Sequence, residues 1–323
     1  MVDSHVNLTI GHVLRHAPSK GGQGIEPALI DIAQDLLLRE LYTSGVIDNL
    51  AFKGGTALRK LFAGAEGRFS TDLDFSVRSP EDDMVAVREM LVEAIADTEC
   101  GPFRYGILHR RGKPHMTIAS DLGAVTALTC KLDVNPPPWL PTEQRPWVRM
   151  PIHAHYGGPL PELHVIQIEE NIAEKIARLT RVTPARDAYD LVWIMRNQPK
   201  LGRALDLDLV RRLAVMKVWV DVHGLRSTMH TWKTAHEPQP LDVDHWLRER
   251  EAREFDDGSI SLLATSPPPL GELSKSLSSD YQFMQALTPE ERTLASCSGR
   301  DRALLLRLLA ELPGTQLPQG TCW

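Results

Sequence analysis

Hydrophobic and polar positions alternate in two different ways along this chain, and each way predicts its own kind of element. Apolar residues spaced three and four apart indicate helices at residues 26–42, 57–62 and 84–96. Apolar residues at every second position indicate strands at residues 50–52, 73–77, 103–108, 115–119 and 127–134. The first half of the chain is therefore predicted to form a sheet with helices around it.

Residues 136–163 break this pattern, because they are rich in proline and glycine and show little periodicity. We interpret them as the connection between an N-terminal α/β lobe, residues 1–150, and a mainly helical lobe, residues 151–323. Helical spacing returns at residues 168–180, 185–196, 207–222 and 289–312. Prolines, serines and acids between positions 236 and 280 predict loops and short helices. The expected fold class is α+β.

Composition indicates the general class of the protein and its cellular compartment. The 323 residues are 42% hydrophobic and 24% charged, which is typical of a globular protein, and the chain is long enough for two compact domains or one large one. No stretch approaches the roughly 18 consecutive apolar residues of a membrane span, and the N-terminus lacks a secretion signal. The four cysteines lie far apart and suggest neither a disulfide framework nor a zinc site. His153 and His155 are interpreted as surface histidines. We expect a cytoplasmic protein without membrane contact.

The first candidate chemistry combines a glycine turn with a pair of acids. Lys53-Gly54-Gly55-Thr56 joins a predicted strand to a predicted helix, where backbone N–H groups can bind a phosphate. Asp72 and Asp74 follow on a strand, and their two-residue spacing puts both carboxylates on one face. Such carboxylates repel each other unless a cation lies between them, and Mg²⁺ joins carboxylates to substrate phosphates. Alone, either motif also fits a plain turn or a solvated strand edge; in this order they predict nucleotidyl or phosphoryl transfer.

A third carboxylate fits the same scheme. Asp133 lies on the predicted strand 127–134, with Leu132 and Val134 on the opposite face. If this strand lies beside the strand of Asp72, three carboxylates can surround two metal ions, which stabilise the attacking and the leaving oxygen. The alternative is an ordinary acid at a strand end before a proline turn.

Together these segments resemble the AbiEii-type nucleotidyltransferase toxin family, which includes the MenT toxins. The matching segments are KGGTAL at 53–58, RFSTDLDF at 68–75, KLDV at 131–134, ENIAEKI at 170–176 and RDAYDL at 186–191. The resemblance covers residues 26–196. It implies a nucleotidyltransferase fold, with a mixed sheet, flanking helices and a C-terminal helical lobe. It also implies a toxin of a toxin–antitoxin system, countered by a cognate antitoxin and acting in phage defence.

The resemblance implies roles for individual residues. The expected catalytic residues are Asp72, Asp74, Lys175 and Asp187, and the expected ligands of Mg²⁺ are Asp72, Asp74 and Asp133. The residues expected to bind the NTP and its phosphates are Lys53, Gly54, Gly55, Thr56, Arg68, Ser70 and Arg178. In some members of the family a partner kinase silences the toxin at the serine that matches Ser70, so phosphorylation of Ser70 is a hypothesis for this chain.

Helical spacing places two of these residues independently of the resemblance. Over residues 168–180, Lys175 lies on a polar stripe beside the apolar one, from which it can neutralise triphosphate oxygens. Without the other motifs, a solvated lysine on a charged helix is the favoured interpretation. Asp187 shares a helix face with Asp190, so it can belong to the active site, hold Lys175 or Arg186 in position, or cap its helix.

Charge is unevenly distributed along the chain. The total of 36 Lys and Arg against 42 Asp and Glu gives a net charge of −6, which excludes a globally basic nucleic-acid binder. Residues 166–235, however, carry four Lys and eight Arg against eight acids. This lobe can receive the phosphates of a tRNA acceptor stem. Alternatively, its arginines pair with neighbouring acids.

Our interpretation is a monomeric nucleotidyltransferase. The 3′-hydroxyl of an acceptor attacks the α-phosphate of an NTP, and pyrophosphate leaves. The resemblance implies a tRNA 3′ end as acceptor and CTP or another NTP as donor, so that translation is blocked. Two alternatives stay open: transfer to a protein or small molecule, and a catalytically inactive fold that acts as a regulatory module. The intact Asp72, Asp74 and Lys175 argue against the second.

Overall fold

The structure, a computed structural model, describes residues 5–18, 25–122, 128–181, 184–223, 239–248, 268–299 and 301–315. The chain divides into two compact units. The first consists of Met1–Pro138, Thr142–Ile166 and Ser261–Ser266, and the second of Trp139–Pro141, Gln167–Ile260 and Pro267–Trp323. The expected lobe boundary at residue 150 lies inside the first unit, because Thr142–Ile166 contributes two further strands to its sheet.

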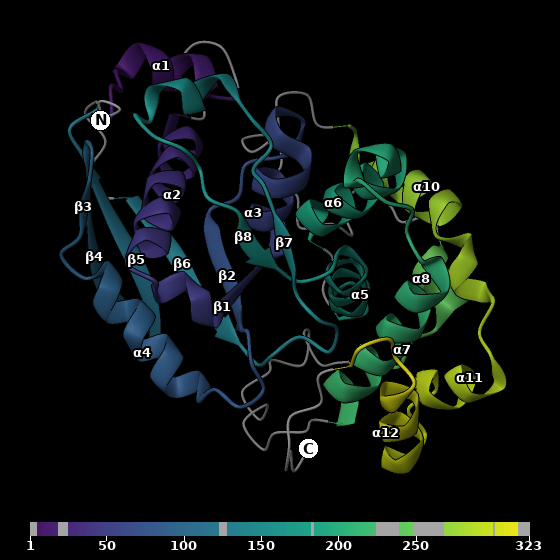
Figure 1. The fold of residues 1–323 in the computed structure, drawn as a ribbon. Coiled ribbons are helices and arrows are strands. Elements are labelled where there is room, and N and C mark those ends of the chain that lie inside the picture. Colours follow the sequence, from purple (N-terminus) through teal and green to yellow (C-terminus); the bar gives the residue numbers. More distant parts are fainter. Residues whose placement is uncertain are drawn as a thin grey trace. The chain divides into compact units, whose positions relative to one another are not determined.

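Within the described residues, eight strands of the first unit form one mixed sheet, in the order β3-β4-β5-β6-β2-β1-β8-β7 (Figure 1). The strands are β1 (Leu50–Lys53), β2 (Asp72–Val77), β3 (Glu99–Cys100), β4 (Phe103–Arg110), β5 (Lys113–Ser120), β6 (Leu128–Asn135), β7 (Glu143–Arg145) and β8 (Leu163–Val165). β2 runs antiparallel to β1 and parallel to β6. All five predicted strands are present; β3, β7 and β8 are additional.

Helices cover this sheet. They are α1 (Ile10–His16), α2 (Ile25–Thr43), α3 (Gly54–Leu58) and α4 (Met84–Ile95), with a π-helical turn η2 (Arg59–Ala63) directly after α3 and short 3-10 turns η1 (Val46–Asn49), η3 (Gly64–Glu66) and η4 (Pro151–His155). In Figure 1, α2 lies across the sheet, where it contacts β3 and β6, while α4 contacts β4 and β6. The predicted helix 57–62 thus begins earlier, at Gly54, and continues as a π turn.

The core of the first unit follows from the alternation in β2. Leu73, Phe75 and Val77 are fully buried, and the Phe75 ring lies 5.3 Å from that of Phe52 on β1. Burial of each such side chain stabilises the fold by about 1.5–3 kcal/mol. The opposite face of β2 carries Asp72 and Asp74, which are less buried. Hydrophobic packing therefore fixes which way the two acids face.

The second unit is helical in its described part. Its helices are α5 (Ile168–Arg178), α6 (Ala185–Arg196), α7 (Leu207–His223), α8 (Val243–Leu247), α10 (Leu270–Asp280), α11 (Pro289–Ala295) and α12 (Arg302–Ala310), with 3-10 turns η5 (Gln198–Leu201) and η9 (Gln282–Gln285). The predicted helix 289–312 is two helices, because the chain turns at Cys297 with a positive φ of 48°. α5 packs on α7, and α6 on α10.

Two general features follow from the described residues. None of the helices placed by the structure is long and apolar enough to cross a membrane. Cys100, Cys130 and Cys297 carry free thiols, and burial raises the pKa of the Cys297 thiol to about 11. Cys322 lies outside the described residues.

Candidate active site

The three predicted metal ligands of the first unit lie on adjacent strands. In the parallel pair of β2 and β6, Asp74 is the register partner of Asp133, and Asp72 is the partner of Lys131. Both strands bury alternate residues, which leaves these four polar side chains on the same face. The expectation that the Asp133 strand lies beside the Asp72 strand is confirmed.

Electrostatic repulsion marks this face. The pKa of Asp74 is raised to about 6 by burial and by the negative charges of Asp72 and Asp133, while Lys53 and Lys131 act in the opposite direction. The carboxylate of Asp133 forms an ion pair with Lys131. The face therefore carries more negative charge than its lysines neutralise.

These residues fit a divalent cation by their chemistry. Among the described residues, no three Asp, Glu, His or Cys side chains converge into a preassembled metal cluster. The donors available are carboxylate oxygens only, which is the set that Mg²⁺ prefers. The raised pKa of Asp74 shows that added positive charge would stabilise the face. Binding of the ion would require Asp133 to exchange its contact with Lys131 for the metal.

Gly54 brings the turn after β1 against Asp74. It has a φ of 77°, and a Cβ atom at this position would lie 2.6 Å from Oδ2 of Asp74. A side chain would therefore be strained by the backbone and would clash with the acid. Lys53, which is buried, is the register partner of Asp74 on β1. The glycine motif and the acid motif thus meet in space, as their order in the sequence predicts.

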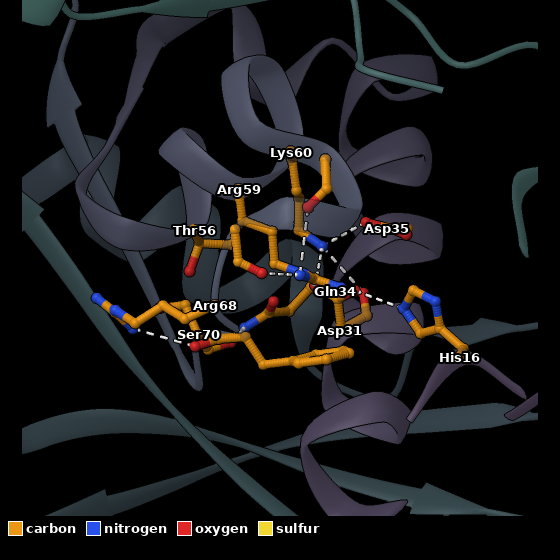
Figure 2. A network of polar contacts seen from close by, with 12 residues as sticks. His16, Asp31, Gln34, Asp35, Thr56, Arg59, Lys60, Arg68 and Ser70 are labelled. Carbon is orange, nitrogen blue, oxygen red and sulfur yellow. Dashed lines mark hydrogen bonds and ion pairs between the residues drawn. The ribbon is translucent and has the colours of Figure 1, made fainter. Parts of the chain in front are cut away.

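The side chains of Gln34 and Thr56 bind the backbone at the start of β2. Figure 2 shows Gln34 beside Ser70. The side-chain nitrogen of Gln34, on α2, donates to the carbonyl oxygen of Ser70 at 3.2 Å and to that of Asp72 at 3.5 Å. Thr56 Oγ1 also donates to the Asp72 carbonyl. Gln34 is fully buried, with 0% exposure. The backbone of the first acid is therefore fixed by side chains that the sequence patterns did not single out, with Thr56 as the exception.

The segment before β2 is buried as well. Arg68 donates to the carbonyl oxygen of Phe69 at 3.1 Å. Ser70 is only 6% exposed. A kinase could reach the Ser70 hydroxyl only if this segment moved, since Gln34 also binds its carbonyl.

A buried ionic network joins α2 to η2 and was missed from the sequence. Asp31 accepts from Arg59 Nε and Lys60 Nζ, each at 3.0 Å, and Lys60 also pairs with Asp35. Burial alone would raise the pKa of Asp31, but Arg59 and Lys60, with His16 at 2.7 Å, hold it well below its usual value. In the sequence, the signal for this network is a pair of acids, four positions apart, among the apolar residues of the predicted helix 26–42.

In the second unit, Lys175 is held by two acids of α6. Its Nζ lies 3.1 Å from Asp187 Oδ1 and 2.8 Å from Asp190 Oδ2, and all three side chains are buried. Arg178 Nε lies 3.3 Å from Asp187 Oδ2. Of the roles open to Asp187, the structure displays the positioning of Lys175.

Glu170, in the same segment 170–176 as Lys175, binds backbone and side-chain groups within the second unit. Its carboxylate accepts the backbone N–H groups of Trp139 at 2.9 Å and Leu140 at 3.0 Å, and pairs with Lys217 at 2.8 Å. The Lys217 ammonium lies over the Trp139 ring, 4.2 Å from its centroid. Glu170 is therefore a structural residue, whereas its sequence context indicated only membership of a motif.

The cations of residues 166–235 are largely paired within the second unit. Seven form ion pairs with carboxylates: Lys175, Arg178, Arg181, Arg196, Arg203, Arg211 and Lys217. The alternative of pairing with neighbouring acids is confirmed for these seven residues.

The interpretation of two surface histidines is wrong for His153. It is 5% exposed, and its Nε2 lies 3.5 Å from Asp35 Oδ2. His155 stacks on His12 with ring centroids 3.6 Å apart.

A mixed sheet that sets a glycine turn against acids of the neighbouring strand defines a nucleotidyltransferase fold. A family model described as "Nucleotidyl transferase AbiEii toxin, Type IV TA system" matches residues 35–294. The chain therefore belongs to the AbiEii family of nucleotidyltransferase toxins, as its motifs predict.

One solved structure in particular supports this assignment. The nucleotidyltransferase toxin MenT4 from Mycobacterium tuberculosis is 33% identical over 94% of this chain and 98% of that chain, with a TM-score of 0.79. Cid1, described as an RNA terminal uridylyl transferase, is 15% identical over 76% of this chain and 62% of its own, with a TM-score of 0.21. Among curated proteins no significant match was found. The chain is thus a nucleotidyltransferase and a toxin of a toxin–antitoxin system, a class that acts with an antitoxin.

Proposed function

We propose that this toxin transfers a nucleoside monophosphate from an NTP, CTP in the first instance, to the 3′ end of a tRNA and so blocks translation. The observation that carries the proposal is the face shared by Asp72, Asp74 and Asp133 beside the turn at Gly54. The raised pKa of Asp74 supports a cationic ligand at this face. The acceptor and the preferred nucleotide rest on the resemblance to the family.

In this proposal each group of residues has its own task. Asp72, Asp74 and Asp133 would hold Mg²⁺, which supplies positive charge to the phosphate oxygens when bound. The N–H groups of Gly54 and Gly55 bind the phosphates of the NTP. The hydroxyl of Thr56 joins them only by exchanging its hydrogen bond to the Asp72 carbonyl for one to a phosphate oxygen. Lys53, Arg68, Ser70 and Arg178 complete the nucleotide contacts, and Lys175, positioned by Asp187, neutralises the triphosphate. The acceptor hydroxyl is the nucleophile, so no protein nucleophile takes part.

Partners follow from the same proposal. A cognate antitoxin neutralises the toxin in the cell, and the toxin acts as a monomer in the cytoplasm and in phage defence. The charge of residues 166–235 adds little support for tRNA, because most of its cations are paired. A tRNA would have to be bound by cations outside these pairs.

The decisive experiment supplies purified protein with Mg²⁺, total tRNA and each α-labelled NTP in turn. We expect label in the tRNA band, strongest with CTP, and none with Asp72→Asn. Glu81→Gln, an exposed acid after β2, serves as the matched control and should retain full activity. Label in protein or in a small molecule would overturn the tRNA assignment, and an active Asp72→Asn would overturn the site.

A further inference from the structure

A pocket of about 310 Å³ lies in the first unit, and no residue of the proposed active site lines it. Its polar lining consists of Arg15, His16, Arg59 and the stacked His12 and His155, without any carboxylate. Phe69 is among the apolar residues that complete the wall. A pocket with only cationic and neutral donors is suited to an anion.

Arg59 provides a buried donor in this pocket. The residue is 2% exposed; its Nε donates to Asp31 at 3.0 Å and its Nη1 to the carbonyl oxygens of Gly64 at 3.3 Å and Gly67 at 2.6 Å. Within the described residues, Nη2 has no protein partner. Figure 2 shows this side chain among its partners from α2. Its Nε and Nη1 groups are fixed by protein acceptors, while the N–H groups of Nη2 can donate to an oxyanion.

The rim of the pocket adds further positive charge. Arg15 lies on α1, is exposed and has no acidic partner among the described residues. The rings of His12 and His155 stack 3.6 Å apart at 16°. Burial, and then the nearby charges of His155 and Arg15, lower the pKa of His12. Arg15 and Arg59 are the permanent cations of the lining, and the lowered pKa of His12 reflects positive charge beside it. An anion in the pocket would offset this charge.

We propose that this pocket binds a small organic phosphate, with its phosphate group between Arg15 and Arg59 and its apolar part against Phe69. Planar guanidinium groups match phosphate oxygens with paired hydrogen bonds. The volume is at the lower end of the range for ligand pockets, roughly 300–1,000 Å³. The ligand is therefore smaller than a nucleoside triphosphate and is bound separately from the NTP.

The site also touches the segment that leads to the metal acids. The Arg59 guanidinium lies 3.7 Å from the centre of the Phe69 ring and holds the carbonyl of Gly67. A ligand on Arg59 would therefore add to the contacts that fix the chain ahead of Asp72. This makes the pocket a place from which a small metabolite can act on the toxin.

The test titrates the full chain with phenyl phosphate, benzoate and inorganic phosphate, followed by NMR of the histidine rings and by calorimetry. The samples contain no Mg²⁺, NTP or RNA, so that failure of the proposed transferase reaction does not affect the result. We expect saturable binding of phenyl phosphate, with shifts at His12 and His155, and weaker binding of the other two probes. Arg15→Gln should weaken binding about tenfold, while Arg110→Gln, an exposed arginine of β4 away from the pocket lining, should not change it.

Three outcomes would overturn the proposal. The first is the absence of saturable binding at millimolar phenyl phosphate. The second is unchanged affinity in Arg15→Gln, together with unmoved His12 and His155 signals. The third is equal affinity for benzoate, which would exclude a phosphate site. Because Arg15 is exposed, its replacement tests binding without a risk to folding.

Discussion

Asp74 and Asp133 are register partners on the parallel strands β2 and β6. Strand pairing alone therefore brings together two acids that lie 59 positions apart in the sequence. The same register sets Lys131 opposite Asp72. Repulsion on this face is thus built into the backbone pairing.

Removal of one carboxylate should disable the site without unfolding the protein. For Asp74→Asn and Asp133→Asn we expect transferase activity to fall by about 10²–10³-fold, because charge stabilisation at the phosphates is lost. Stability should hold or rise, since the repulsion that raises the pKa of Asp74 is removed. Initial rates and thermal melts, with Glu81→Gln as control, measure both effects. Retained activity in both variants would place the chemistry elsewhere.

Gly54 and Gly112 form a matched pair for the glycine turn. Both have positive φ, 77° and 74°, but a Cβ at Gly54 would meet Asp74, whereas nothing lies within 4 Å of one at Gly112. Backbone strain should lower the stability of both Gly54→Ala and Gly112→Ala by about 1–2 kcal/mol, and the contact with Asp74 should lower that of Gly54→Ala further. Only Gly54→Ala should also lose activity. Equal activity in the two variants would show that the approach to Asp74 is unimportant.

Gln34 should act as a positioning residue for the start of β2. Gln34→Met keeps its length but removes the donor to the carbonyls of Ser70 and Asp72. We expect the Mg²⁺ concentration at half-maximal activity to rise by about tenfold, with a small change in melting temperature. Gln34→Glu, which sets a carboxylate beside these carbonyl oxygens, should be worse than Gln34→Met. A loss of stability with unchanged Mg²⁺ dependence would make Gln34 a purely structural residue.

Asp31 should make the first unit sensitive to acid. Arg59 and Lys60 keep its pKa in the folded protein well below the usual value, so its contribution to stability is complete above the unfolded pKa of about 4 and is lost as the pH falls below that. Asp31→Asn should cost about 3–5 kcal/mol at pH 7, because it leaves the buried Arg59 without its carboxylate partner and Lys60 with Asp35 alone. Urea unfolding at pH 7, 5 and 3.5 should show the gap between wild type and variant narrowing only at the lowest pH. A gap that is independent of pH would contradict this account.

A comparison of Lys175→Met with Asp190→Asn tests whether Lys175 is catalytic or only structural. Lys175→Met leaves Asp187 and Asp190 buried without their common partner, which should cost about 3–5 kcal/mol and abolish activity. Asp190→Asn also weakens the pair, but Asp187 still holds the ammonium group. At a temperature where Asp190→Asn is folded, the activity of this variant should therefore stay within about tenfold of wild type. If both variants lose activity only in proportion to the unfolded fraction, Lys175 has no catalytic part.

The elements that could be predicted from the sequence are those with long periodic patterns. β4, β5 and β6, with eight residues each, and α2, with nineteen, leave clear alternation, whereas β7 and β8 have three residues and leave none. The connection was therefore interpreted as irregular although it adds two strands.

The candidate site divides along similar lines. Asp72 and Asp74 stand two positions apart in one predicted strand, so spacing alone predicted their common face. Asp31 and Arg59 are 28 positions apart, and nothing in the local pattern of either residue indicates the other. The paired state of Arg203 and Arg211 likewise depends on acids brought close by folding, which a count of charges cannot show.

The path of the chain through its two units limits where the protein can be divided into fragments. Trp139–Pro141 belongs to the second unit, although the residues before and after it belong to the first. A fragment that starts at Gln167 would lack the two N–H groups that Glu170 binds, and so would leave a buried carboxylate beside Lys217 alone. If the chain is cut after residue 166 and the two fragments are co-expressed, we therefore expect them to reassemble poorly. A synthetic second unit would need the Trp139–Pro141 tripeptide grafted ahead of Gln167.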